Sequence, residues 1–224
     1  MVTRVSAQDH ARVSAAIAQA ERATAGEIVT AVAAQSDGYR DAALHWAVLA
    51  MLAVPALLAW QPSIADRLWG LVGDAWSGAP AGAPFVVALV GSVLAFLLVR
   101  LLLAPTTVRM ALTPGATKTR RVRRQALALF RVGAERRTRG RTGVLIYLSL
   151  AERRAEIVAD AAIHDKVADD VWGEAMAALL APVREGRAGD GLVAAIGAVG
   201  RVLAEHFPRE EDDVNELPDR LIET

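Results

Sequence analysis

Four residues in the second half of the chain have side chains that could do chemistry together. They are one histidine and three aspartates near the ends of predicted elements: Asp160, His164, Asp165 and Asp190. Ca²⁺ and Mg²⁺ prefer oxygen ligands, and their sites need several carboxylates or carbonyls that converge on one point. These residue types therefore indicate a candidate Ca²⁺ or Mg²⁺ site, which Glu27 from an earlier predicted strand would join.

A purely structural role is the alternative for the same residues. Aspartate is a favoured helix N-cap, so Asp165, Asp169 and Asp190 would each begin a helix and His164 would be a surface loop residue. The chain contains no C-x₅-R, D-x-D-x-T, G-x-S-x-G, H-E-x-x-H or G-x-x-x-x-G-K-[ST] motif. It has no cysteine, which excludes disulfides, thiolate metal sites and a cysteine nucleophile. Both interpretations stay open from the residues alone.

The elements that would position these residues form an α/β pattern. Helical spacing of Val13 and Ile17 predicts a first helix that ends near Gly26, and residues 27–34 predict a strand. Residues 144–150 and 155–159 predict an antiparallel hairpin, because only four residues connect them. The first hairpin strand is apolar on both faces, as in a central strand, and the second is nearer an edge.

Two helices and a tail are predicted after the hairpin. The first helix runs from Asp169 or Asp170 to about Val183, and the second follows a cap at Asp190. Three glycines in the second helix predict close packing against a neighbour: Gly191, Gly197 and Gly200. Residues 209–224 are acidic and predict an extended tail.

Two apolar stretches interrupt this pattern. Residues 42–60 carry no charge and residues 85–103 carry one, Arg100. A helix needs about 20 apolar residues to cross a bilayer, so the two stretches predict a transmembrane hairpin. A pair of helices buried in a soluble core is the alternative. The tryptophans of the connecting segment are typical of a membrane interface: Trp60, Trp69 and Trp76.

Basic residues beside the predicted spans indicate their orientation. The connecting loop contains only Arg67, whereas many basic residues follow the second span: Arg109, Lys118, Arg120, Arg121, Arg123 and Arg124. By the positive-inside rule, both termini are predicted to be cytoplasmic. The first residues also lack the apolar region of a secretory signal.

Charge is segregated along the chain, although the total is 25 basic and 25 acidic residues. Residues 106–154 contain 13 Lys/Arg and 2 Asp/Glu, and residues 155–224 contain 6 and 16. An amphipathic helix is predicted after Thr119, with Val122, Leu127, Phe130 and Val132 on one face. Four arginines of this helix are predicted to face anionic lipid: Arg120, Arg121, Arg123 and Arg124. Nucleic acid is not predicted as a partner, because no aromatic interleaving or recognition motif accompanies them.

The order of these segments resembles the TPM domain family. The resemblance covers residues 12–41 and 124–208 and rests on four segments: GEIVTAV at 26–32, RTGVLIYLSLAERRAEIVAD at 141–160, G-x-x-x-DGLVAAIGAVG at 186–200 and HFP…NELPD at 206–219. The resemblance implies an α/β/α sandwich with a small central sheet. Some members are described as acid phosphatases or divalent-metal binders, and others as assembly or repair factors for membrane complexes. The glycine-rich E-x-G-x-G stretch common in the family is replaced here by Glu156-Ile-Val-Ala-Asp160.

Together these observations predict a TPM-like α/β/α sandwich interrupted by a two-helix transmembrane hairpin. Its parts are predicted as a helix and strand at 1–41, the hairpin at 42–104, the rest of the domain at 105–208 and the acidic tail at 209–224. The predicted function is a non-catalytic binding or assembly module at the cytoplasmic face of the bacterial inner membrane. Its predicted partners are the bilayer and a membrane protein complex. A divalent-metal-dependent phosphatase-like hydrolase is the alternative.

Overall fold

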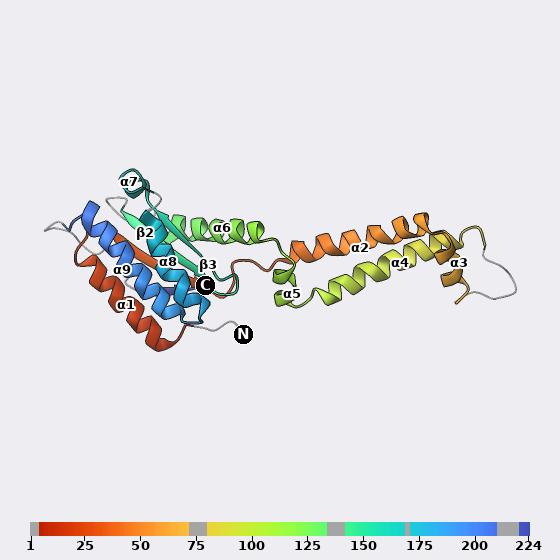
Figure 1. Cartoon of the computed structure of the whole chain (residues 1–224), viewed down its shortest axis with the longest axis horizontal. Helices are drawn as coiled ribbons and strands as arrows, with labels where there is room; N and C mark the ends of the chain where they lie inside the picture. The colour runs from red at the N-terminus through yellow and green to blue at the C-terminus, as the bar shows by residue number, and fades with distance from the viewer. Residues whose placement is uncertain (1–4, 72–79, 134–141, 169–170, 210–219) are drawn as a thin grey trace. The chain divides into compact units, whose positions relative to one another are not determined.

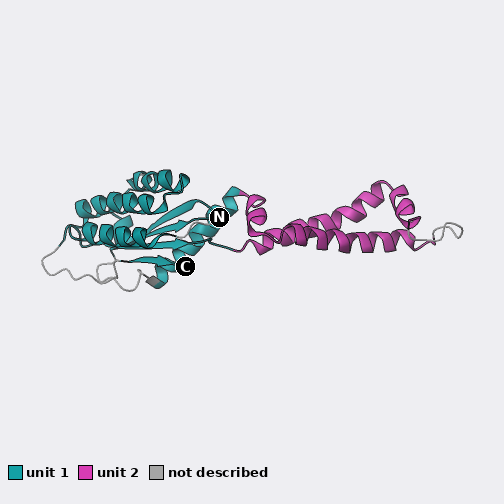
Figure 2. Cartoon of the chain, turned by 90° about the horizontal axis from the view of Figure 1, so that it is seen from below, with its two compact units in different colours: residues 1–37, 115–224 teal, residues 38–114 magenta. Residues whose placement is uncertain are grey.

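A computed structural model describes residues 5–71, 80–133, 142–168, 171–209 and 220–224. The chain divides into two compact units, which Figure 2 distinguishes by colour. Unit 1 consists of Met1–Asp37 and Gly115–Thr224, and unit 2 consists of Gly38–Pro114. Unit 2 is thus inserted in the sequence between two segments that fold together.

Unit 1 is built on a four-stranded sheet with the order β3-β2-β1-β4. The strands are β1 (Glu27–Ala33), β2 (Gly143–Ser149), β3 (Arg154–Ala159) and β4 (Leu221–Glu223). β2 pairs with β1 in parallel and with β3 in antiparallel orientation. The predicted hairpin, its central first strand and its edge second strand are therefore confirmed.

Three residues within the predicted acidic tail form the strand β4. It pairs in parallel with Thr30, Ala31 and Val32 of β1. Leu221 is 6% exposed and belongs to the main apolar core. The short apolar pair Leu221–Ile222 offers too little periodicity to predict a strand from sequence, but it completes an open edge of the sheet.

Helices cover both faces of the sheet (Figure 1). α1 (Ala7–Glu21), α8 (Val171–Arg184) and α9 (Ala188–His206) share one core with the strands, and α7 (Ala161–His164) follows β3. α6 (Gly115–Gly133) packs on the other face through Val122, Ala126 and Phe130. Successive strand side chains point to opposite faces, so both cores draw on the same strands. The predicted α/β/α sandwich is confirmed.

Small residues let the helices of unit 1 approach closely. A Cβ at Gly191 would collide with the carbonyl oxygen of Leu179 in α8, and one at Gly200 would lie 2.7 Å from the Cβ of Ala20 in α1. Gly197 differs, because the nearest atom to its added Cβ is Nη1 of Arg201 at 3.9 Å. Close packing is therefore confirmed at two of the three predicted glycines.

Several predicted helix details are wrong. α9 begins at Ala188 after Arg187, so Asp190 lies in the first turn and is not the N-cap. Asp165 follows the last residue of α7, whose N-cap position is Asp160. Asp169 and Asp170 lie outside the described residues. Val132 of α6, predicted on the apolar face, is exposed, and Ala126 is buried. The reason is that α6 contacts the sheet through Val122, Ala126 and Phe130.

Unit 2 consists of helices: α2 (Arg40–Trp60), α3 (Ser63–Trp69), α4 (Ala83–Leu102) and α5 (Thr106–Ala111). α2 and α4 lie side by side, and a Cβ on Gly91 would be 3.1 Å from Cγ1 of Val54. Both helices are long and apolar enough to cross a membrane, by length and composition. Only 11% of the most apolar 18-residue stretch of α2 is buried, and none of that of α4. The alternative of two helices buried in a soluble core therefore does not describe them.

Candidate functional site

Three of the predicted cation ligands lie in or beside α7, which is one turn long: Asp160, His164 and Asp165. Asp160 is 4% exposed, and its carboxylate accepts a hydrogen bond from the Gly143 amide at 3.2 Å. The Asp160 amide donates in return to the Gly143 carbonyl at 2.9 Å. His164 and Asp165 are exposed. Asp160 thus joins the end of the hairpin to the start of β2.

The sheet register also brings Glu27 toward Asp160. Glu27 lies opposite Gly143 in the β1–β2 pair, and Asp160 bonds to the same glycine from the other side. Both acidic residues are buried. Glu27 and Asp160 lie on either side of Gly143, which has no side chain to offer. Two carboxylates are fewer ligands than Ca²⁺ or Mg²⁺ needs.

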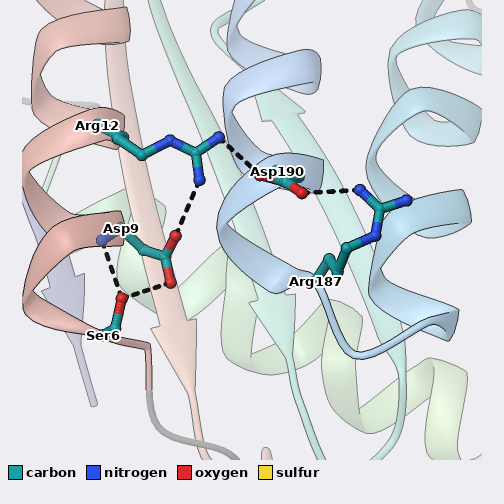
Figure 3. Close-up of polar contacts among 5 residues, drawn as sticks. All are labelled: Ser6, Asp9, Arg12, Arg187 and Asp190. Atoms are coloured by element: carbon teal, nitrogen blue, oxygen red, sulfur yellow. Dashed lines mark hydrogen bonds and ion pairs between the residues drawn. The ribbon is translucent and has the colours of Figure 1, made fainter.

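Asp190 has a different role from the one predicted. Its two carboxylate oxygens bind Arg12 of α1 at 2.6 Å and Arg187 at 2.7 Å (Figure 3). The hydrogen bond from Arg187, followed by that from Arg12, lowers the pKa of Asp190 below its usual value. Two guanidinium groups this close would repel a metal ion. In the part of the chain that the structure describes, no three His, Cys, Asp or Glu side chains are grouped to hold one.

The neighbours of Asp190 extend this network across α1. Arg12 also contacts Asp9 at 3.2 Å, and the Ser6 hydroxyl donates to Asp9 at 2.7 Å while accepting from the Asp9 amide at 3.1 Å (Figure 3). Ser6 is the N-cap of α1. Asp190 and its partners therefore tie the N-terminal part of α1 to the first turn of α9, which is a packing role.

A buried polar cluster that the sequence did not reveal lies at the carboxyl ends of β1 and β2. Glu152 accepts hydrogen bonds from the Ser149 hydroxyl and, at 2.9 Å, from the Ser36 amide. The Ser36 hydroxyl lies 2.9 Å from the Tyr147 hydroxyl, and burial raises the pKa of Tyr147. Ligands often bind at this edge of parallel sheets. Here the polar groups hydrogen-bond to one another. The residues 151–154 look from sequence like an ordinary charged turn, so no signal marks this cluster.

The predicted lipid-facing arginines of α6 separate into two groups. Arg121 is 12% exposed and its guanidinium lies 3.0 Å from the carboxylate of Asp37, so it faces the fold. The other three share an exposed face with Arg131, and this arginine face surrounds a shallow groove of about 330 Å³ lined by Arg120, Arg123, Arg124, Leu127, Ala128 and Arg131. The spacing of these residues shows that one face of a single helix forms the groove.

The arginine face has two carboxylates beside it. Arg124 is 74% exposed and contacts Asp37 at 3.2 Å. Glu156 of β3 has a pKa raised mainly by burial, an effect that the charge of Arg123 partly offsets. The face can therefore attract anions.

Comparisons with known proteins agree with this architecture. The NMR structure of the BA42 protein from the psychrophilic bacterium Bizionia argentinensis is similar, with a TM-score of 0.58 and 20% identity over 99% of this chain and 97% of that one. At this identity the likeness shows the fold alone. No curated protein matches the chain in sequence.

A family model matches a continuous part of the chain. The model of the TPM domain matches residues 106–202. These residues run from α5 to α9 and include the hairpin of β2 and β3, whereas α1 and β1 lie outside the match. The matched segment contains the arginine face, Asp160 and Asp190. The match over residues 106–202 is consistent with a member of the TPM domain family.

Proposed function

We propose that this chain is a membrane-anchored TPM-domain protein whose unit 1 is a non-catalytic binding or assembly module. The observation that supports anchoring is the exposure of large apolar side chains along α2 and α4: Leu49, Leu52, Leu57, Phe85, Leu89, Leu94, Leu97 and Leu101. Removing one such side chain from water is worth about 1.5–3 kcal/mol. A hairpin with this surface is far more stable in lipid than in water.

The sheet of unit 1 supports two crossings of the bilayer. β1 precedes α2 and β2 follows α4, yet the two strands pair in parallel from Glu27 opposite Gly143 to Ala33 opposite Ser149. Strands can pair in this way only when both lie on the same side of the membrane. An even number of crossings between them satisfies that condition, and α2 and α4 supply two.

Basic residues support a cytoplasmic location for unit 1. The loop between α2 and α4 contains only Arg67, whereas Arg109 and Lys118 and the arginines of α6 follow α4. Short cytoplasmic loops carry the excess of Lys and Arg. In the proposed arrangement, a multi-pass protein of the bacterial inner membrane holds both termini in the cytoplasm.

Fractionation and reporter fusions test the anchor and its orientation. We expect the full chain to stay in the membrane pellet after alkaline carbonate washing. A green fluorescent protein fused after Thr224 is expected to fluoresce, and alkaline phosphatase inserted after Gly82 is expected to be active in the periplasm. Extraction by carbonate would contradict anchoring. Periplasmic activity of a phosphatase fused after Thr224 would contradict the orientation.

A phosphatase assay tests the non-catalytic role. Purified full chain is incubated with p-nitrophenyl phosphate, with and without Mg²⁺ or Ca²⁺, and we expect no turnover above a heat-inactivated sample. Asp160→Asn and Asp165→Asn, at the two ends of α7, are the informative variants. Metal-dependent turnover that Asp160→Asn or Asp165→Asn abolishes would replace the module with a hydrolase.

A further inference from the structure

α6 has two faces of different chemistry. Val122, Ala126 and Phe130 are buried against the sheet. The arginine face, by contrast, presents four exposed guanidinium groups around the groove that Leu127 and Ala128 help to line. Among the described residues that line the groove, none is acidic. The apolar contacts of α6 with the sheet do not involve these arginines, and only Arg124 among them pairs with a described carboxylate, that of Asp37, within 4 Å.

We propose that the arginine face of α6 binds anionic phospholipid headgroups of the membrane in which the protein is anchored, an inference that rests on the proposed function. A guanidinium group matches a phosphate with two parallel hydrogen bonds, and its weak hydration favours partly buried contacts. The apolar atoms of Leu127 and Ala128 would meet the glycerol and upper acyl region between the headgroups.

Chain connectivity limits how far the start of α6 can lie from the end of α4. Residues 103–114 connect the end of α4 to the start of α6. A connection of this length spans at most about 40 Å even when fully extended. A basic segment tethered beside a span is attracted to anionic lipid within about one Debye length of the surface. In the proposal, the anchor raises the local concentration of anionic headgroups around the arginine face, and the guanidinium groups supply the selectivity for them.

Nucleic acid fits the same face less well. Single-stranded nucleic acids are bound by aromatic side chains on which bases stack, together with a basic groove. The described residues that line this groove include no aromatic side chain. The arginines are complementary to the phosphates of both lipid and nucleic acid. The described residues that line the groove, however, offer no aromatic ring on which a base could stack.

A single introduced thiol can report occupancy of the groove. The chain has no cysteine, so Ala128→Cys places its only thiol inside the arginine face. The full-length variant is reconstituted in nanodiscs of phosphatidylcholine, alone or mixed with phosphatidylglycerol, and its reaction with a water-soluble maleimide is timed. We expect a reaction at least about threefold slower in the anionic nanodiscs at low salt, with the difference lost at high salt because exposed charges are screened.

Matched variants separate lipid binding from general effects of the bilayer. Gln19→Cys on the exposed surface of α1 is expected to react equally in both nanodiscs. Adding Arg120→Gln, Arg123→Gln and Arg131→Gln to Ala128→Cys is expected to remove the lipid dependence, whereas three Arg→Lys changes at the same positions are expected to retain part of it. The Lys set keeps the charge, so it also controls for any loss of folding in the Gln set.

The outcomes distinguish this inference from the proposed function. Equal Ala128→Cys rates in neutral and anionic nanodiscs would overturn lipid binding, while retention after carbonate washing would still support the anchor. Extraction of the chain by carbonate would contradict the membrane anchor of the proposed function, and with it this inference. Protection by free inorganic phosphate or by an RNA oligonucleotide in neutral nanodiscs, equal to that given by phosphatidylglycerol, would also overturn the assignment to lipid.

Discussion

Asp190 in the first turn of α9 accepts a hydrogen bond at 2.6 Å from Arg12 of α1, which lies 178 positions earlier in the chain. The pair explains why a residue that looks like a metal ligand in sequence is a helix-to-helix contact in the fold. Both side chains are partly exposed, so the contact contributes modestly and is screened by salt. Its main consequence is to keep Asp190 ionised.

Removing the Asp190 carboxylate is expected to destabilise the protein in a pH-dependent way. The pKa of Asp190 is lowered in the fold, so its contribution is present above the ordinary aspartate pKa and is lost as pH falls through the lowered value. Asp190→Asn should lower the thermal midpoint at neutral pH, and the difference from the parent should shrink in acid below about pH 4. Asp165→Asn is the control. An equal loss at all pH values would show that packing, not charge, accounts for the effect.

Glu156 is expected to behave in the opposite sense. Burial raises its pKa in the fold, so the stability it contributes is full below its ordinary pKa and is lost as pH rises through the raised value. Glu156→Gln should therefore raise the thermal midpoint at neutral pH and change it little in acid. A lower midpoint at neutral pH would mean that the attraction of Arg123 outweighs the cost of burial.

Two glycines in α9 provide a matched test of its packing. Gly191→Ala should destabilise unit 1 by about 1–3 kcal/mol, because the added methyl group would push α9 away from the Leu179 carbonyl in α8. Gly197→Ala has open space and should be neutral or stabilising by up to about 1 kcal/mol through helix propensity. Urea unfolding of the detergent-solubilised chain, followed by pulse proteolysis, measures both. The packing described for α8 and α9 would be wrong if the two variants were equally stable.

The polar cluster at the carboxyl ends of β1 and β2 is expected to be structural. Glu152→Ala leaves the Ser36 amide and the buried Ser149 hydroxyl without their carboxylate partner, which should cost about 1–3 kcal/mol. Arg153→Ala, at an exposed position in the same turn, is the control. The same urea assay measures the difference. A Glu152→Ala variant as stable as Arg153→Ala would show that water replaces the carboxylate at little cost.

Much of the fold could be predicted because its signals are local. The runs at residues 27–34, 144–150 and 155–159 alternate or continue as strands do, and the helical spacing of Val13 and Ile17 marks α1. The four-residue connection made the β2–β3 hairpin the simplest pairing. The length of the two apolar stretches was enough to predict α2 and α4, because this property depends only on neighbouring residues in the sequence. The end of the chain escaped prediction, because β4 is a three-residue strand that forms only against the edge of β1.

The sequence by itself determined the element types, the two apolar helices and the concentration of arginines after them, since each depends on residues within a few turns of one another. Only the tertiary structure decided how the charged side chains are used. It turned Arg121 toward Asp37 and left Arg120, Arg123 and Arg131 exposed, and it placed Asp190 between Arg12 and Arg187. A carboxylate has the same appearance in sequence whether it meets a cation, a guanidinium group or a backbone amide. Which of these it meets depends on elements that are brought together only when the sheet and its two helical layers have formed.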